Sequence, residues 1–181
     1  MTEPLAMIVS RVLVADPPWA FKDALPGRTR GATRNYRTLP IDGIRAFPLP
    51  PLADDCVLLL WRVAAMQEEA LSVVRAWGFV PKSEIVWLKR TLSGTRWFGM
   101  GRQVRNEHEV ALIATRGRPR RRSASVRSTF EAAVGRHSEK PAEFYAFVER
   151  LYDGPYVELF ARRRRDGWAC VGDELSLEDG S

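Results

Sequence analysis

The chain has few cysteines and histidines and no long apolar run. Two cysteines and two histidines among 181 residues form neither a zinc-binding pattern nor a disulfide framework. Cys56 and Cys170 lie in apolar, strand-like runs, so we expect reduced core residues in a cytoplasmic protein. No window approaches the roughly 18 apolar residues of a membrane-spanning helix. Residues 1–10 contain Glu3 and lack the cationic start and apolar core of a secretory signal.

Several common cofactor and catalytic motifs are also missing. Neither a G-x-G-x-x-G fingerprint nor a phosphate-binding loop occurs, which disfavours a pyrophosphate-bearing cofactor and leaves a nucleoside cofactor without phosphates. No nucleophile elbow or triad order is present. Positive charge is abundant instead, with 28 Lys and Arg against 22 Asp and Glu, a net charge of +6 and a pI near 9.8. This balance favours a polyanionic partner such as nucleic acid.

A tetrapeptide near the start is the most informative motif. The apolar run 12–15 predicts a buried parallel strand, and two prolines after it prevent the strand from continuing. The chain then leaves the sheet at its carboxyl edge, where open α/β proteins bind ligands. A carboxylate and a carbonyl can accept both N–H groups of an exocyclic amine, and an indole can stack on a base. These features predict a nucleobase pocket formed by Asp16, Pro17, Pro18 and Trp19. The alternative is a simple turn, with Asp16 as its cap and Trp19 at the edge of the core.

Strands and helices are predicted to alternate along the chain, which indicates an α/β fold with a mostly parallel sheet and helices on both faces. A single domain is expected at this length. The longer loops, at 22–38 and 92–106, are candidates for functional segments. Beyond the first strand, apolar runs and helical spacing predict strands at 56–61, 83–88, 109–114, 156–161 and 168–171, and helices at 41–46, 64–77 and 140–151.

Charged residues in the last third supply candidate cofactor ligands. Glu158 lies inside a predicted strand, although it could instead face solvent on an edge strand. Asp173 and Glu174 follow the last strand, where carboxylates can bind ribose hydroxyls, and a polar turn is the alternative. Lys140 opens a predicted helix, where its ammonium can meet a ligand carboxylate unless it is simply a solvated surface lysine.

Four motifs taken in order resemble the adenine-N6 methyltransferases, and the similarity covers about residues 12–175. More narrowly, the chain resembles the family that contains the catalytic subunit of the eukaryotic messenger-RNA adenosine methyltransferase and its bacterial and phage relatives. The resemblance implies a Rossmann-like methyltransferase fold with permuted motif order and S-adenosylmethionine as methyl donor. The motifs are Asp16-Pro17-Pro18-Trp19, His137-Ser138-Glu139-Lys140-Pro141, Glu158-Leu159-Phe160-Ala161-Arg162, and Gly167-Trp168 with Gly172-Asp173-Glu174.

Residue roles follow from the same resemblance. It implies that Asp16 lies at the target amino group and Lys140 near the methionine end of the cofactor. The other cofactor contacts that it implies are Glu158, Leu159, Phe160 and Arg162, with Asp173 and Glu174 near the ribose. The chain departs from the family in two ways. Some members carry a histidine and an asparagine soon after the arginine that matches Arg162, where this chain has three further arginines. An upstream strand common in the family is not predicted within residues 1–10.

Nucleic acid is the expected substrate. Trp19 and Tyr36 are expected to stack on the base, and Arg105 and Asn106 to read base edges. Arginines within 28–37, 116–122 and 163–165 adjoin predicted carboxyl ends of strands, where they can hold phosphates. The leading hypothesis is adenine-N6 methylation of DNA. The alternatives are the same chemistry on RNA, a non-catalytic nucleic-acid-binding subunit on the same fold, and a small-molecule methyltransferase. A homodimer or partner subunit stays open, because no separate target-recognition domain fits in this length.

Overall fold

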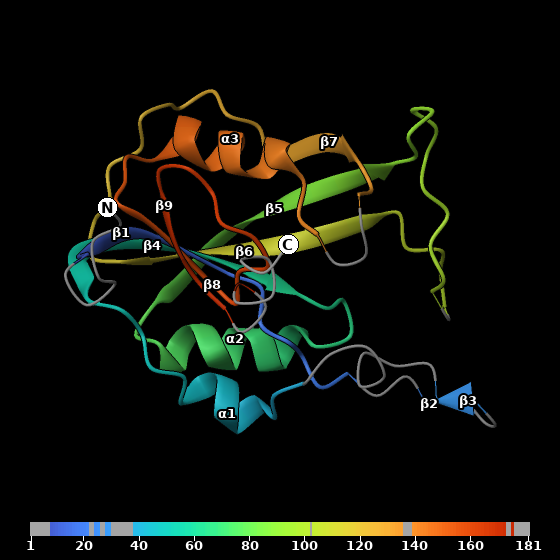
Figure 1. The fold of residues 1–181 in the computed structure, drawn as a ribbon, viewed down its shortest axis with the longest axis horizontal. Helices are drawn as coiled ribbons and strands as arrows, with labels where there is room; N and C mark the ends of the chain where they lie inside the picture. The colour runs from blue at the N-terminus through green and yellow to red at the C-terminus, as the bar shows by residue number, and fades with distance from the viewer. Residues whose placement is uncertain are drawn as a thin grey trace.

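The computed structural model describes residues 8–21, 24–25, 28–29, 38–101, 103–135, 139–172 and 175. Within these residues the centre of the molecule is a seven-stranded sheet in the order β7-β5-β6-β4-β1-β8-β9 (Figure 1). Its strands are β1 (Ser10–Ala15), β4 (Leu52–Arg62), β5 (Val80–Arg90), β6 (His108–Arg116), β7 (Thr129–Ala133), β8 (Tyr156–Leu159) and β9 (Trp168–Val171). The helices are α1 (Ile41–Arg45), α2 (Gln67–Ala76) and α3 (Ala142–Leu151), and β2 (Ala24–Leu25) and β3 (Arg28–Thr29) form a separate antiparallel pair.

The sheet is mostly parallel, as the sequence predicts. Strand β1 pairs in parallel with β4 and β8, β8 pairs in parallel with β9, and β5 pairs in parallel with β7. Only β6, among the seven strands of this sheet, runs the other way, because it is antiparallel to both β4 and β5. The carboxyl ends of β1, β4, β5 and β8 therefore meet the amino end of β6 at one edge of the sheet.

Helices cover both faces of the sheet, with α3 on one face and α1 and α2 on the other (Figure 1). Alternation along β1 explains this division, since successive side chains of a strand point to opposite faces. Val12 and Val14 pack in the α3 core, whereas Leu13 and Ala15 pack in the α1 and α2 core. Burying each larger apolar side chain stabilises the fold by about 1.5–3 kcal/mol, so the apolar run of β1 fixes its central place.

Several boundaries differ from the expected ones. Strands β4 and β5 are longer than their apolar runs, and β5 includes Pro81, next to a shift in pairing register with β6. Helix α2 begins at Gln67 rather than at residue 64, because residues 64–65 form a turn before it. Strand β7 is not predicted from the sequence, since this edge strand buries only Ala132 and so has no apolar pattern.

The run 116–122 does not lie at the edge where the sequence predicts it. It follows β6, and β6 is antiparallel to its neighbours, so its end lies at the opposite edge of the sheet from Asp16. The prediction that this run adjoins the carboxyl ends of the parallel strands is therefore wrong. Across the described ranges, no helix is both long and apolar enough to cross a membrane.

Candidate active site

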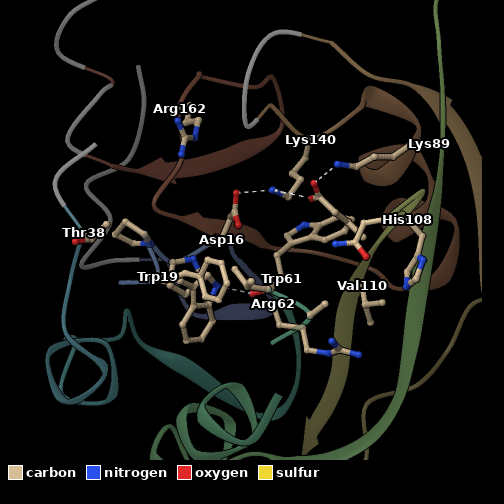
Figure 2. Close-up of a pocket in the computed structure, with 17 residues that line it drawn as sticks. Asp16, Trp19, Thr38, Trp61, Arg62, Lys89, His108, Val110, Lys140 and Arg162 are labelled. Atoms are coloured by element: carbon tan, nitrogen blue, oxygen red, sulfur yellow. Dashed lines mark hydrogen bonds and ion pairs between the residues drawn. The ribbon is translucent and has the colours of Figure 1, made fainter. Parts of the chain in front are cut away.

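A cavity of about 330 Å³ opens at the carboxyl edge of the parallel strands (Figure 2). Segments far apart in the sequence contribute to its wall. Polar or charged side chains come from the turn after β1, the ends of β4 and β5, and the start of β6. Others come from the residue before the Pro141 cap of α3 and from the segment after β8. These side chains include Asp16, Arg62, Lys89, His108, Glu109, Lys140 and Arg162.

Charged side chains of alternating sign form a chain across this cavity (Figure 2). The ammonium group of Lys140 lies 2.6 Å from Oδ2 of Asp16 and 3.4 Å from Oε2 of Glu109. The other oxygen of Glu109 lies 2.5 Å from the Nζ atom of Lys89. Lys140 is nearly buried, with 9% of its side chain exposed. The alternative of a solvated surface lysine is therefore wrong.

The charges in this chain shift each other's pKa in the expected directions. Burial alone lowers the pKa of Lys140, but the neighbouring carboxylates of Asp16 and Glu109 outweigh burial and raise it. Burial raises the pKa of Glu109, but the ammonium groups of Lys140 and Lys89 outweigh it and lower the pKa below its usual value. Lys140 is therefore held as an ammonium and Glu109 as a carboxylate near neutral pH.

The tetrapeptide after β1 forms a tight turn at the cavity wall. The Pro17 carbonyl accepts the backbone N–H of Trp19 at 2.8 Å, and the Pro18 carbonyl accepts the N–H of Leu39 at 2.9 Å. Trp19 is buried and donates its indole N–H to the carbonyl of Trp61 at 3.0 Å. The tetrapeptide thus forms a turn, as the alternative interpretation of the sequence predicts. All four of its residues also line the cavity.

Trp61 forms the wall below the charged chain (Figure 2). The Lys140 ammonium lies 5.0 Å from the centre of its ring, within range of a cation–π interaction. The indole Nε1 of Trp61 is buried, and no described residue accepts its hydrogen. A buried donor without an acceptor is costly, and in a cavity wall it is a candidate contact for a ligand.

A cleft of about 30 Å³ adjoins the larger cavity and shares Asp16, Lys140 and Arg162 with it. Glu158 lines this cleft and accepts a hydrogen bond of 2.6 Å from the hydroxyl of Tyr145. Burial raises the pKa of Glu158, although that hydrogen bond opposes the rise. Because β8 lies between β1 and β9, the alternative of an exposed Glu158 on an edge strand is wrong.

The remaining expected site residues are distributed unevenly. Asn106 lines the larger cavity, whereas Arg105 is exposed beside the ring of Phe98 and does not line it. Phe160 lines the small cleft, and Leu159 is buried in the core. Tyr36, Asp173 and Glu174 lie outside the described residues.

Lys89 and Glu109 are site residues that the sequence analysis does not identify. Both lie near the ends of strands, and the apolar runs of these strands predict the strands but no functional residue. Their one signal is a charged residue at a strand boundary, which is too common to be informative. They meet because β6 runs antiparallel to β5, so that Glu109 pairs with Trp87, two residues before Lys89.

The sheet topology and the cavity at its carboxyl edge define the class of protein, a Rossmann-like methyltransferase. The sequence model described as MT-A70 matches residues 10–174, and the chain belongs to this family of S-adenosylmethionine-dependent N6-adenosine methyltransferases, as the four motifs predict.

Relatives fall into two groups by length. The chain is 31% identical to the N(6)-adenosine-methyltransferase catalytic subunit METTL3 of Homo sapiens and 30% identical to an MT-A70-like protein of Drosophila melanogaster, each over 176 residues. The match covers 91% of this chain but 28% and 26% of those proteins, so the chain spans about a quarter of their length. It is also 27% identical over 186 residues to the type II methyltransferase M.MunI of Mycoplasma sp, with 91% of this chain and 77% of that protein covered.

Proposed function

We propose that this protein transfers the methyl group of S-adenosylmethionine to the N6 amino group of adenine in DNA. The position of Asp16 carries the proposal, because this residue borders both the larger cavity and the small cleft. Lys140 holds its Oδ2 atom, and no described residue donates to Oδ1. One oxygen is therefore available to a ligand amino group, while the ion pair fixes the orientation of the carboxylate.

The larger cavity suits a planar base that carries an exocyclic amine. Its volume of about 330 Å³ falls within the range of small-molecule sites. Trp19, Phe21 and Trp61 supply aromatic wall, and Asn106 and His108 supply polar groups for the base edges. This combination of flat apolar wall and few polar groups is typical of sites that bind an unstacked base.

The residues around Asp16 also fit the chemistry of the proposed cofactor. Once bound, S-adenosylmethionine supplies an electrophilic methyl group attached to a positively charged sulfur. Lys140 would meet its carboxylate, while Glu158, Phe160 and Arg162 line the adjoining cleft for the other contacts. The cleft of about 30 Å³ holds only part of a nucleoside, so the rest of the cofactor would extend into the larger cavity, which shares Asp16, Lys140 and Arg162 with it. Asp173 and Glu174 stay predicted contacts of the ribose.

Asp16 and Pro17 would activate the amine by accepting its two protons. No described residue donates to the Oδ1 atom of Asp16, so this atom can accept one N–H, and the second lone pair of the Pro17 carbonyl can accept the other beside its bond to Trp19. Two such bonds favour a pyramidal nitrogen whose lone pair is no longer conjugated with the ring. Asp16 need not remove a proton first, because the nitrogen becomes acidic only after methylation, when Oδ1 can accept the proton. Positioning and fixed charges then supply most of the rate enhancement.

The net charge supports a nucleic-acid substrate, and one relative supports DNA. The net charge of +6 suits a polyanionic substrate. The match also covers 77% of the type II methyltransferase M.MunI, a DNA methyltransferase, which supports DNA as the substrate. The human relative is named a catalytic subunit, so a partner subunit or homodimer is the alternative assembly, and RNA is the alternative substrate.

The proposal is tested with Asp16→Ala, using Asp42→Ala on the exposed face of α1 as the matched control. Transfer of labelled methyl to DNA should fall by at least about 100-fold in Asp16→Ala, because it loses an orienting contact made to the reacting nitrogen. Cofactor affinity by calorimetry should stay within about threefold of wild type in both variants. Wild-type turnover in Asp16→Ala would overturn the mechanism. DNA binding without transfer or cofactor binding in the wild type would favour a non-catalytic subunit.

A further inference from the structure

Four large apolar side chains are exposed in the connection between β5 and β6. Leu92, Phe98, Met100 and Val104 all lie in this connection, with Phe98 71% and Met100 84% exposed. The connection projects away from the sheet (Figure 1). Clusters of exposed large apolar side chains are uncommon on a protein surface unless they contact a partner.

Two glycines hold part of this connection together as an arm, defined here as residues 98–101 and 103–106. A Cβ atom at Gly99 would overlap the carbonyl oxygen of Asn106, and one at Gly101 would overlap that of Val104. The two sides of the arm therefore pack backbone against backbone, which only glycine allows. The guanidinium of Arg105 lies 5.1 Å from the centre of the Phe98 ring and donates to the carbonyl of Gly101 at 3.5 Å.

The arm is continuous with the candidate active site. Asn106, at its end, lines the cavity that contains Asp16, and so does His108 two residues later. The N–H of Lys89, another cavity residue, donates to the carbonyl of Glu107 at 2.9 Å. The arm, which carries Phe98, Met100 and Arg105, thus joins the wall of the cavity in which a nucleobase would bind.

We propose that this arm inserts Phe98 and Met100 into duplex DNA next to the target adenine. A base reaches the cavity only after it leaves the stack, and apolar wedges between base steps are a common way to stabilise that state. Arg96, which precedes the arm, and Arg105, within it, suit the flanking phosphates. This inference rests on the proposed function, since it assumes that the substrate is duplex DNA. A second copy of this chain seated on the arm is the competing explanation.

The test compares wild type with the double variant Phe98→Ser/Met100→Ser, and Leu92→Ser serves as the matched control. Leu92 is equally apolar and 91% exposed, but it lies outside the arm. The substrates are a circular double-stranded DNA and its single-stranded form. On the double-stranded form, kcat/KM of the double variant should fall by about tenfold or more, and on the single-stranded form by less than about twofold. Leu92→Ser should change neither value.

A second readout applies whether or not single strands are methylated. Binding of wild type to a duplex that contains 2-aminopurine in place of adenine should raise its fluorescence, and binding of the double variant should not. The insertion of Phe98 and Met100 would be contradicted if the double variant lost kcat/KM equally on both DNA forms and still raised the fluorescence as wild type does. A wild type that methylates only single strands would also contradict it, as would a wild-type dimer that becomes monomeric in the double variant. Absence of transfer by wild type to any nucleic acid would instead contradict the proposed function itself.

Discussion

The Nζ atom of Lys140 donates a hydrogen bond of 2.6 Å to Oδ2 of Asp16, although the two residues are 124 positions apart in the chain. Asp16 belongs to the turn that ends β1, and Lys140 precedes the helix that covers one face of the sheet. The Lys140 ammonium also lies 5.0 Å from the centre of the Trp61 ring. The orientation of the proposed catalytic carboxylate therefore depends on the docking of α3.

Replacing Lys140 should impair catalysis more than folding. In Lys140→Met the carboxylate of Asp16 loses its partner, and we expect kcat to fall by about 100-fold, the cost of a lost charge-assisted contact. Lys140→Arg keeps the charge and should recover part of that loss. Initial rates at saturating and limiting cofactor separate kcat from KM, and Lys82→Met on the exposed surface is the control. Unchanged kcat in Lys140→Met would contradict a role for this ion pair.

Glu109 should contribute to stability above acidic pH. Its folded-state pKa is lowered, so its stabilising contribution is present above the unfolded value and is lost as the pH falls through the folded value. Glu109→Gln should therefore show a flatter decline in the free energy of unfolding below about pH 4.5, with a difference of at most about 1 kcal/mol because the group is partly exposed. Urea unfolding between about pH 3 and 7 measures this. If the free energy of unfolding fell equally at acidic pH in wild type and in Glu109→Gln, a stabilising role for the charged chain would be contradicted.

Fold and site were predictable to different extents for physical reasons. Apolar runs located β1, β4 and β8, and the proline pair after β1 located Asp16 at the carboxyl edge. The apolar run 109–114 predicts the strand β6, but an apolar run carries no information on strand direction. The antiparallel direction of β6 is therefore not predicted, nor are the meeting of Glu109 with Lys89 and the true position of the run 116–122. Long-range pairing decides these features, and no local signal reports it.

Tyr145 should stabilise the buried carboxylate of Glu158. Tyr145→Phe removes a hydrogen bond of 2.6 Å to a buried group, and we expect a loss of about 1–3 kcal/mol in the free energy of unfolding. The pKa of Glu158 is raised in the folded state, and losing the hydroxyl should raise it further. The deficit should therefore shrink as the pH falls and Glu158 becomes protonated.

Chemical denaturation at about pH 7 and pH 4 measures that change in deficit. Tyr156→Phe is the control, since its hydroxyl donates to the Tyr152 carbonyl at a partly exposed site and should contribute less. A deficit that grows as the pH falls would contradict the assignment of a charged Glu158 as the acceptor.

Arginines of the run 116–122 should differ sharply from one another. Arg122 donates from its side chain to the carbonyl of Glu149 at 2.9 Å and from its backbone to that of Leu151, at the end of α3. Arg122→Ala should lower the free energy of unfolding by about 0.5–1 kcal/mol. Arg120→Ala and Arg121→Ala should leave both stability and the salt dependence of DNA binding unchanged. A weaker salt dependence of DNA binding in these two variants would instead indicate that nucleic acid binds at this edge of the sheet.

Transfer of labelled methyl from S-adenosylmethionine tests the central claim most directly. Wild-type protein is offered duplex DNA, single-stranded DNA and RNA, and each product is digested to nucleosides. We expect label in N6-methyl-2′-deoxyadenosine from DNA. Label only in adenosine from RNA, or label on another atom of the base, would contradict this expectation.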